Sequence, residues 1–330
     1  MKSKYQNGFF IFGIVVLAIM LTQLDYGQVW DGVTHAGYWF LAVIVLWGLL
    51  YILNTGAWWL IIRSQKTDGS RPPFSFWWLY KITVSGFALN YATPGGLMGG
   101  EPYRIMSLSP KIGTERASSS VILYVMTHIY SHFWFWLLSV VLYLATQRIT
   151  PLIVPILTAI TAFCLLAIWF FLKGYRRGIA VTGMSLLSHF PIVKRWAQPF
   201  FERNRERLAE IDQQVAALHN QNRGTFVGAV MLELTCRVVS ALEIFFILLV
   251  IMPSVSYVQC ILILAFTSLF ANMLFFMPLQ LGGREGGFLM STEGLGISVR
   301  AGIFVALLVR LRELIWTAIG LALIKLDKKQ

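Results

Sequence analysis

Two short motifs place carboxylates and arginines inside a chain that is otherwise strongly apolar. The first, N-x-x-x-P-G-G-x-x-G-x-E over residues 90–101, ends on Glu101 and is followed by Arg104. The second, within MPLQLGGREGG, contains Arg284 and Glu285. An ionisable side chain in a membrane helix costs about 3 kcal/mol on insertion scales, so it usually faces the bundle interior, where it pairs or lines a pathway.

These motifs suit the binding of an anionic phosphate head group. Arginine can hold a phosphate through two parallel hydrogen bonds, and the amino terminus of a half-helix presents a positive dipole end. Alternatively, each glutamate caps backbone amides or pairs with its neighbouring arginine to hold a turn. Both roles stay open from the sequence. The residues expected to form the turns and gates are Pro94, Gly95, Gly96, Gly99, Pro278, Gly282 and Gly283.

The segment LELTCRVVSALEIF carries two opposite charges one helical turn apart. Glu233 and Arg237 are spaced i,i+4, so they share a helix face and are predicted to form an intramembrane ion pair. Glu243 lies close to the same face. The pair can be a relay for protons or head groups, or a neutralised structural pair, and the sequence favours neither.

The last apolar run carries Arg310, Arg312 and Glu313 near its middle. Because Arg312 and Glu313 are successive residues, they do not share a helix face. At least one of these charges must therefore find a partner elsewhere in the bundle. All three are candidates for lining the pathway, and Arg310 is also a candidate for contact with the substrate.

Two histidines and two asparagines are expected to form hydrogen bonds. His128 and His132 have the i,i+4 spacing of metal ligands, but no HExxH signature, cysteine or carboxylate accompanies them. We therefore predict no metal and no cofactor. Asn90 and Asn272 are expected to cap broken helices, and Asn90 is also a candidate for substrate contact.

The sequence offers no enzyme signature in the context that such a signature requires. There is no nucleophile elbow, phosphate-binding loop or dinucleotide fingerprint between a strand and a helix. Cys164, Cys236 and Cys260 lie in or beside apolar runs without metal-ligand spacing, so we expect them to be packing residues. The chain is predicted not to be an enzyme.

The amino-acid composition predicts an integral membrane protein. Of its 330 residues, 57% are hydrophobic and only 13% are charged. The net charge of +12 is carried between apolar runs, which indicates topology and not nucleic-acid binding. Runs long enough to span a bilayer, about 20 residues, are 8–24, 36–62, 118–146, 151–172, 225–251 and 301–325, and two interrupted runs are 77–99 and 258–281.

The distribution of basic residues predicts the orientation. The connection 23–35 contains no lysine or arginine, whereas 63–71, 103–117 and 173–224 are basic and are expected to be cytoplasmic. Segment 77–99 then enters and leaves on one side. Such a re-entrant segment is tolerated only where protein or water satisfies its backbone. Both chain termini are predicted to be cytoplasmic.

An internal repeat organises these elements. Pro94 and Pro278 lie 184 positions apart, and the same offset aligns the glycine and the glutamate of a shared P-x4-G-x-E pattern. Each half has an odd number of crossings, which predicts an inverted-topology repeat with its two motifs on opposite membrane faces. The expected fold is an all-α polytopic membrane protein with about six spanning helices and two re-entrant segments. Its parts are a first repeat (1–150) containing 77–99, and a second repeat (151–330) containing an amphipathic stretch (174–224) and 258–281.

The motif over 90–101, Arg104 and the entry RASSSVILY (116–124) together resemble the lysylphosphatidylglycerol synthase transmembrane region, also called flippase-like membrane proteins. The degenerate second motif at 278–285 and the helix arrangement extend this resemblance over nearly the whole chain. It implies the lipid-handling membrane part without the cytosolic aminoacyl-transferring domain of bifunctional members. It does not identify the lipid.

The function expected from these observations is movement of an amphipathic lipid between leaflets of the bacterial inner membrane. The lipid would be an anionic or modified phospholipid or a glycolipid. The alternative is an accessory protein that organises a lipid-modifying or envelope-assembly enzyme without transport. The sequence leaves open whether the chain forms a homo-oligomer or binds such an enzyme. Nucleic acid is not expected as a partner. Within 174–224, the stretch 194–221 has an amphipathic pattern that suits a membrane surface, a partner or a solvated linker.

Overall fold

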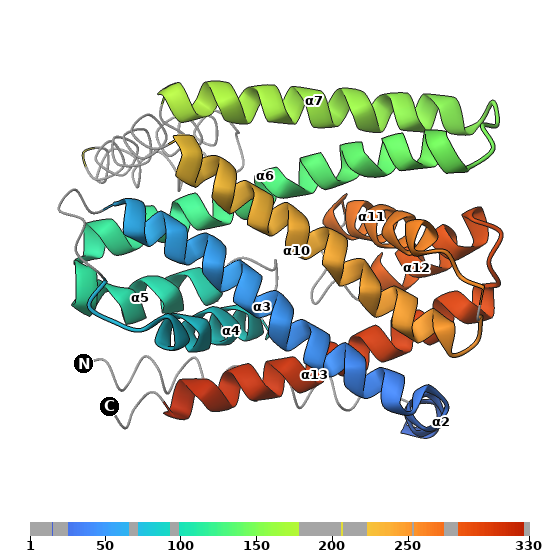
Figure 1. Cartoon of the computed structure of the whole chain (residues 1–330), viewed down its shortest axis with the longest axis horizontal. Coiled ribbons are helices and arrows are strands. Elements are labelled where there is room, and N and C mark those ends of the chain that lie inside the picture. The colour runs from blue at the N-terminus through green and yellow to red at the C-terminus, as the bar shows by residue number, and fades with distance from the viewer. Residues whose placement is uncertain are drawn as a thin grey trace, which may run out of the picture.

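The protein is a bundle of long helices in a computed structural model (Figure 1). The structure describes residues 15, 26–65, 72–92, 99–177, 206, 223–252, 254–273 and 283–326. Within these residues it contains ten helices and no strand, which confirms the all-α prediction. The helices are α2 (Tyr26–Ala36), α3 (Tyr38–Ser64), α4 (Phe76–Ala92), α5 (Gly100–Ile112), α6 (Thr114–Thr146), α7 (Ile153–Arg177), α10 (Arg223–Leu249), α11 (Tyr257–Met273), α12 (Gly283–Gly294) and α13 (Val299–Leu326).

Three of the described helices are both long and apolar enough to cross a membrane. They are α3, α6 and the Ile153–Leu172 part of α7. Helices α10 and α13 have 27 and 28 residues, so they also reach about 40 Å at 1.5 Å per residue. These two carry most of the buried charges described below, which lowers their average hydropathy. The predicted run 8–24 and the amphipathic stretch 194–221 lie outside the described residues, apart from Val15 and Glu206.

The two interrupted runs become short helices. Helices α4 and α11 have 17 residues each, about 25 Å, and fall short of the roughly 30 Å hydrocarbon core. Each packs on the short helix that follows it, α5 or α12. In Figure 1, α4 and α5 lie toward the left end of the bundle, and α11 and α12 toward the right end. The turn residues Pro94, Gly95, Gly96, Pro278 and Gly282 lie outside the described residues, so re-entry itself stays a prediction.

The helices of the two halves follow one another at nearly the same offset. Helices α3, α4, α5 and α6 start at residues 38, 76, 100 and 114, and α10, α11, α12 and α13 at 223, 257, 283 and 299. Contacts between helices are also shared: α3 packs on α10 in the centre, α4 packs on α13, and α6 packs on α11. Helix α7 has no counterpart among the described helices and lies at the edge of the bundle (Figure 1).

The closest of these packings depends on a glycine. At Gly320 of α13, an added Cβ would lie 2.9 Å from the Val84 carbonyl oxygen of α4, and closer still to the Ala88 side chain. The Ser85 hydroxyl donates a hydrogen bond to the Gly320 carbonyl at 3.0 Å. The middle of α4 can therefore lie against α13, which brings the end of α4 to the charged residues of α13.

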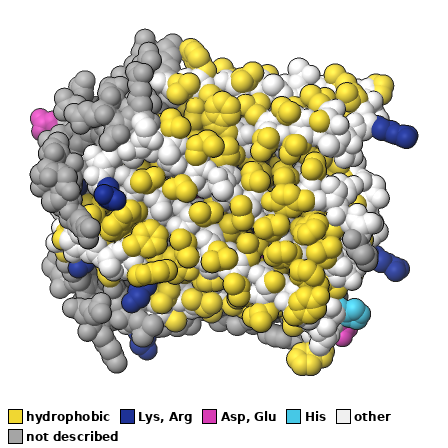
Figure 2. Space-filling view, viewed as in Figure 1, with side chains coloured by type: hydrophobic (Ala, Val, Ile, Leu, Met, Phe, Trp, Pro, Cys, Tyr) yellow, Lys and Arg dark blue, Asp and Glu magenta, His cyan; other side chains and the backbone are white. Residues whose placement is uncertain are grey.

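The surface agrees with a membrane environment. Large apolar side chains are exposed along α7, among them Phe163, Leu166 and Trp169. Figure 2 shows hydrophobic side chains over most of one face, with lysine and arginine side chains toward its left and right ends. The apolar band between charged ends is the pattern of a protein that crosses a bilayer.

Candidate functional site

The first motif is joined across the break between α4 and α5 by Asn90. Its side-chain oxygen accepts a hydrogen bond from the Gly100 amide at 2.7 Å, and its side-chain nitrogen donates to Glu101 at 2.8 Å. At Gly100 an added Cβ would collide with the Gly86 carbonyl oxygen, so only glycine fits. The predicted capping role of Asn90 is confirmed. Asn272 instead donates to the Ser268 carbonyl within its own helix.

Arg104 is enclosed by aromatic side chains. It pairs with Glu101 at 3.3 Å, as predicted, and its side chain is only 2% exposed. The guanidinium carbon lies 4.7 Å from the ring centre of Phe87 and 5.3 Å from that of Tyr124, distances typical of cation–π contacts. Gly86 leaves the space that the guanidinium occupies. A ligand would have to displace these rings to reach Arg104.

The second motif pairs differently from the prediction. Arg284 does not hold its neighbour Glu285: it forms an ion pair with Glu313 of α13, while Glu285 pairs with Arg310 at 3.5 Å. Successive residues on a helix point about 100° apart, so each side chain of α12 contacts a different residue of α13. The alternative in which each glutamate pairs with its neighbouring arginine therefore holds for the first motif and not for the second.

Tyr91 connects the second motif to the end of α4. Its hydroxyl donates a hydrogen bond to Glu313 and accepts one from Arg310 at 2.8 Å. Because Tyr91 follows Asn90, the partner of Glu101, a short path of contacts joins the two motifs near the middle of α13. These contacts bring the two motifs closer together than expected, while their placement on opposite membrane faces stays a prediction.

A second buried ion pair joins α10 to α13. The Arg312 guanidinium donates two hydrogen bonds to the Glu243 carboxylate, at 2.7 and 3.0 Å. Trp47 of α3 donates to the same carboxylate at 2.9 Å, and its ring lies 3.8 Å from the guanidinium carbon. This pair was missing from the predicted site, although the expectation that Arg312 or Glu313 has a partner on another helix is confirmed for both.

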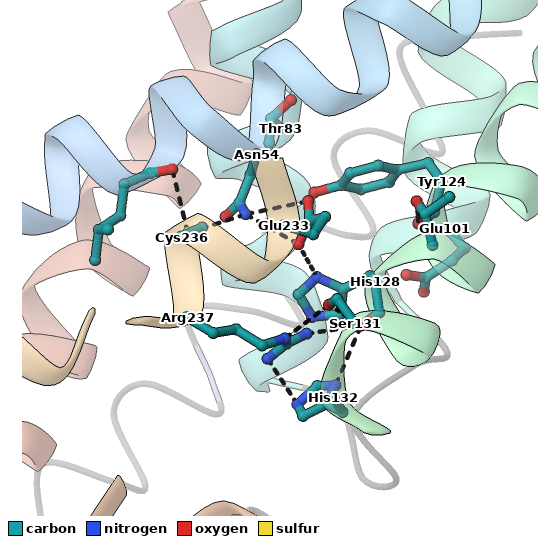
Figure 3. Close-up of polar contacts among 12 residues, drawn as sticks. Asn54, Thr83, Glu101, Tyr124, His128, Ser131, His132, Glu233, Cys236 and Arg237 are labelled. Atoms are coloured by element: carbon teal, nitrogen blue, oxygen red, sulfur yellow. Dashed lines mark hydrogen bonds and ion pairs between the residues drawn. The ribbon is translucent and has the colours of Figure 1, made fainter. Parts of the chain in front are cut away.

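Glu233 is fully buried at the meeting point of three helices (Figure 3). It accepts hydrogen bonds from Asn54 of α3 at 3.2 Å and lies 2.7 Å from Nδ1 of His128 on α6. Arg237, the predicted partner of Glu233, also forms its side-chain hydrogen bonds with residues of α6. Arg237 contacts Ser131 at 2.8 Å, the His128 carbonyl oxygen at 2.7 Å and His132 Nε2 at 2.7 Å.

The predicted direct pair between Glu233 and Arg237 is therefore replaced by two links from α10 to α6. Both histidines take part in hydrogen bonds, as expected. No group of three potential ligands among the described histidines, cysteines and acidic residues could hold a metal ion. The three cysteines are free and buried, in agreement with a packing role.

A polar cavity of about 240 Å³ lies between the Glu233 and Glu313 networks. Its walls come from both halves of the chain, through α3, α4, α6, α10, α12 and α13. Opposite charges face it from several sides, because Glu233, Arg237, Arg284, Arg312 and Glu313 all line it. The remaining lining residues are Trp47, Tyr51, Asn54, Phe87, Ala88, Tyr91, His128, His132, Cys236, Ser240, Trp316 and Thr317.

The predicted substrate-binding residues thus fall into three groups. Glu233, Arg237 and Arg284 line the cavity, whereas Asn90, Glu101 and Arg104 form the enclosed network beside it. Arg310 and Glu285 connect to the cavity through Glu313 and Tyr91. Gly99 and Gly283 lie at the amino-terminal ends of α5 and α12.

The residues predicted to bind the substrate did not include six that the structure brings together: Trp47, Asn54, Tyr91, Glu243, Arg312 and Glu313. The last three were identified from the sequence as charges inside apolar runs, but their partners were not. For the first three, a single polar side chain in an apolar run gave too weak a signal.

Comparison with known proteins identifies one family. The model of the lysylphosphatidylglycerol synthase TM region matches residues 8–320, which include both motifs and every residue that lines the cavity. Neither a search of curated proteins nor a search of solved structures found a match. The resemblance noted in the first motif is thereby confirmed across the two halves.

Proposed function

The chain belongs to the lysylphosphatidylglycerol synthase TM region family, a membrane family linked to lipid handling, and on this premise we propose that it moves an amphipathic lipid between membrane leaflets. The lipid carries an anionic or modified head group, and its chains stay in contact with the bilayer. The proposal assigns the chain no catalytic residue. It places the protein in a bacterial inner membrane.

The observation that carries this proposal is the polar cavity in the middle of an apolar bundle. Five arginine and glutamate side chains face a cavity of about 240 Å³ that is lined by both halves. Charges at membrane depth are costly, and they usually mark the path of a substrate or an ion. A purely structural set of ion pairs would have no need of an open space between its members.

The chemistry of the cavity suits a head group that carries a phosphate. Arg237, Arg284 and Arg312 face it, and guanidinium groups bind phosphate oxygens in pairs. The carboxylates of Glu233 and Glu313 face it as well, so a head group that also carries an amine would find partners of both signs.

A polar stripe on α10 extends along the cavity. Glu233, Arg237, Ser240 and Glu243 follow one another at spacings of four, three and three, which keeps them on one helix face. From Glu233 to Glu243 this stripe covers about 15 Å, half of the roughly 30 Å hydrocarbon core. A head group in the cavity can therefore exchange partners among Glu233, Arg237 and Ser240, which line it.

The arrangement of the two halves supports alternating access by an inverted repeat. Four helices of one half match four of the other in order and in contacts, and the two broken pairs approach the centre from opposite ends of the bundle (Figure 1). Inverted repeats whose broken helices meet near the midplane are typical of secondary transporters. One half would rock against the other around the cavity.

The distribution of charge supports cytoplasmic termini. The end of the bundle where α3, α5 and α13 finish and α6 begins carries Arg63, Lys111, Arg116 and Lys325 (Figure 1, left). At the other end, α6 finishes near Arg148 and α13 begins near Arg300. Because basic residues favour the cytoplasmic side, the first end is assigned to the cytoplasm.

Leaflet exchange in liposomes tests the proposal. Purified protein is reconstituted, and the transfer of fluorescent phosphatidylglycerol and phosphatidylcholine between leaflets is followed. The Glu233→Gln variant keeps groups that can bond to Asn54 and His128 but removes the charge, and Glu115→Gln changes an exposed glutamate at the start of α6.

We expect wild type and Glu115→Gln to exchange at least one of the two lipids, and Glu233→Gln to be slower by about tenfold or more, equal to roughly 1.4 kcal/mol. Absence of exchange in folded wild-type protein would contradict transport and favour the accessory role. Turnover of a lipid head group by the pure protein would indicate an intramembrane enzyme instead.

A further inference from the structure

An apolar groove of about 290 Å³ lies beside the second motif. Its walls are formed by α6, α7, α11 and α12, and Ile156, Met273 and Met290 are more than half exposed at its opening. The described side chains that line it carry no charge. They are Tyr143, Ile153, Ile156, Ile160, Phe266, Leu269, Phe270, Met273, Gly287, Met290, Ser291, Gly294 and Leu295.

Helix α12 has one end at the polar cavity and lines the groove along the rest of its length. Arg284, in its first turn, lines the cavity, whereas Gly287, Met290, Ser291 and Gly294 line the groove. The spacing of these four residues, three, one and three, places them on one helix face. Helix α6 is shared in the same way, because His132 lines the cavity and Tyr143 lines the groove.

We propose that this groove holds one acyl chain of the lipid whose head group lies in the polar cavity. The inference rests on the proposed function and adds a chain-binding site to it. A groove that opens from an apolar membrane surface is filled by hydrocarbon, since no water is available there. Because α12 lines both the groove and the charged cavity, the pair of sites suits an amphipathic molecule whose two ends fit the two environments.

The dimensions agree with a single chain. From Arg284 to Gly294, α12 rises about 15 Å, which is the depth of one leaflet in a hydrocarbon core of roughly 30 Å. The groove lies near the lower limit of ligand pockets, about 300 Å³, and is too small for a whole phospholipid. A helix of a second protein, with a diameter of about 10 Å, does not fit into it either.

Two glycines provide a matched test. An added Cβ at Gly294 meets nothing within 4 Å, so a leucine there fills the groove without a clash. Gly224, near the start of α10, is equally open and lies away from the groove, so Gly224→Leu is the control. Ile156→Trp fills the groove from α7, at a residue already 51% exposed, and guards against a defect particular to α12.

The measurement is native mass spectrometry of the full-length protein with dioleoyl- and dihexanoyl-phosphatidylglycerol. We expect wild type and Gly224→Leu to retain the long-chain lipid at least about tenfold better than the short-chain lipid, because its additional methylene groups are buried in the apolar groove. Gly294→Leu and Ile156→Trp should each lose most of this preference, with thermal stability like that of the control.

Equal retention of the long-chain lipid by wild type and both groove variants would overturn the inference, as would a wild type without chain-length preference. Arg284→Gln separates the two sites, because it should weaken both lipids and leave the preference for the long chain intact. Leaflet exchange by wild type in liposomes tests the proposed function independently. If wild type exchanges lipid but Gly294→Leu keeps the preference for the long-chain lipid, the groove inference alone is rejected. If wild type retains the long-chain lipid but exchanges none, transport alone is rejected.

Discussion

Arg104 follows the first P-x4-G-x-E motif and Arg284 lies within the second, and the surroundings of the two arginines differ. Arg104 is 2% exposed, held by Glu101 and covered by the rings of Phe87 and Tyr124. Arg284 is 32% exposed, lines the polar cavity and pairs with Glu313 on another helix. The first motif is built as a closed joint between α4 and α5, and the second presents its arginine to a space that a ligand can enter.

This difference shows that a repeat in sequence does not require two equivalent sites. The contacts of the first motif keep it closed, whereas the arginine of the second motif lines the polar cavity. Three pairs of substitutions, one residue from each half, test this division, and they are given from the largest expected effect to the smallest.

The arginines should show the largest contrast. Arg104→Gln leaves the Glu101 carboxylate without its cation in a buried site, so we expect a loss of about 3 kcal/mol or more in the free energy of unfolding. Arg284→Gln should cost less than about 1 kcal/mol, because Glu313 keeps Tyr91, Arg310 and Arg312 as partners. Thermal unfolding in detergent measures both. Equal destabilisation by the two variants would contradict the division.

The glycines should show an intermediate contrast. At Gly86, a Cβ would collide with the Arg104 guanidinium, which the surrounding rings prevent from moving, so Gly86→Ala should destabilise by roughly 1–3 kcal/mol. At Gly286 a Cβ meets only Phe270 at 3.7 Å, an ordinary contact. Gly286→Ala should be neutral or stabilise by up to about 1 kcal/mol through helix propensity. A stable Gly86→Ala variant would show that the Arg104 site is looser than described.

The asparagines should show the smallest contrast. Asn90→Ala removes the hydrogen bonds to the Gly100 amide and to Glu101, which should cost about 1 kcal/mol, as for other helix caps. Asn272 is exposed and bonds only within its own helix turn in the described contacts, so Asn272→Ala should change stability by less than about 0.5 kcal/mol. The same unfolding assay applies, and a larger cost at Asn272 would reverse the comparison.

Much of the fold could be predicted because it follows from patterns within single segments. The apolar runs predicted the long helices, and the clusters of proline and glycine predicted the breaks after Ala92 and Met273. The offset of 184 between the motifs agrees with the starts of matched helices, such as α5 at Gly100 and α12 at Gly283. Pairing within one helix turn was also predictable for Glu101 and Arg104.

Partners on different helices could not be predicted, since helix spacing identifies only neighbours on the same helix. Glu233 and Arg237 have the spacing of an ion pair, but buried charges take the partners that packing brings closest, and here these lie on α3 and α6. Glu243 and Arg312 are 69 residues apart and meet only because α10 packs on α13. The link between the two motifs through Tyr91 could not be predicted for the same reason: topology gives the side from which a segment enters, but not how far it reaches.

The central claim is that the second motif faces a lipid pathway and the first does not. Leaflet exchange of fluorescent phosphatidylglycerol in liposomes that contain Arg284→Gln, beside wild type and the exposed-residue control Glu293→Gln, tests this most directly. The account predicts that Arg284→Gln keeps its thermal stability and loses about tenfold or more of the exchange rate, while the control matches wild type. An unchanged exchange rate in stable Arg284→Gln protein would contradict it.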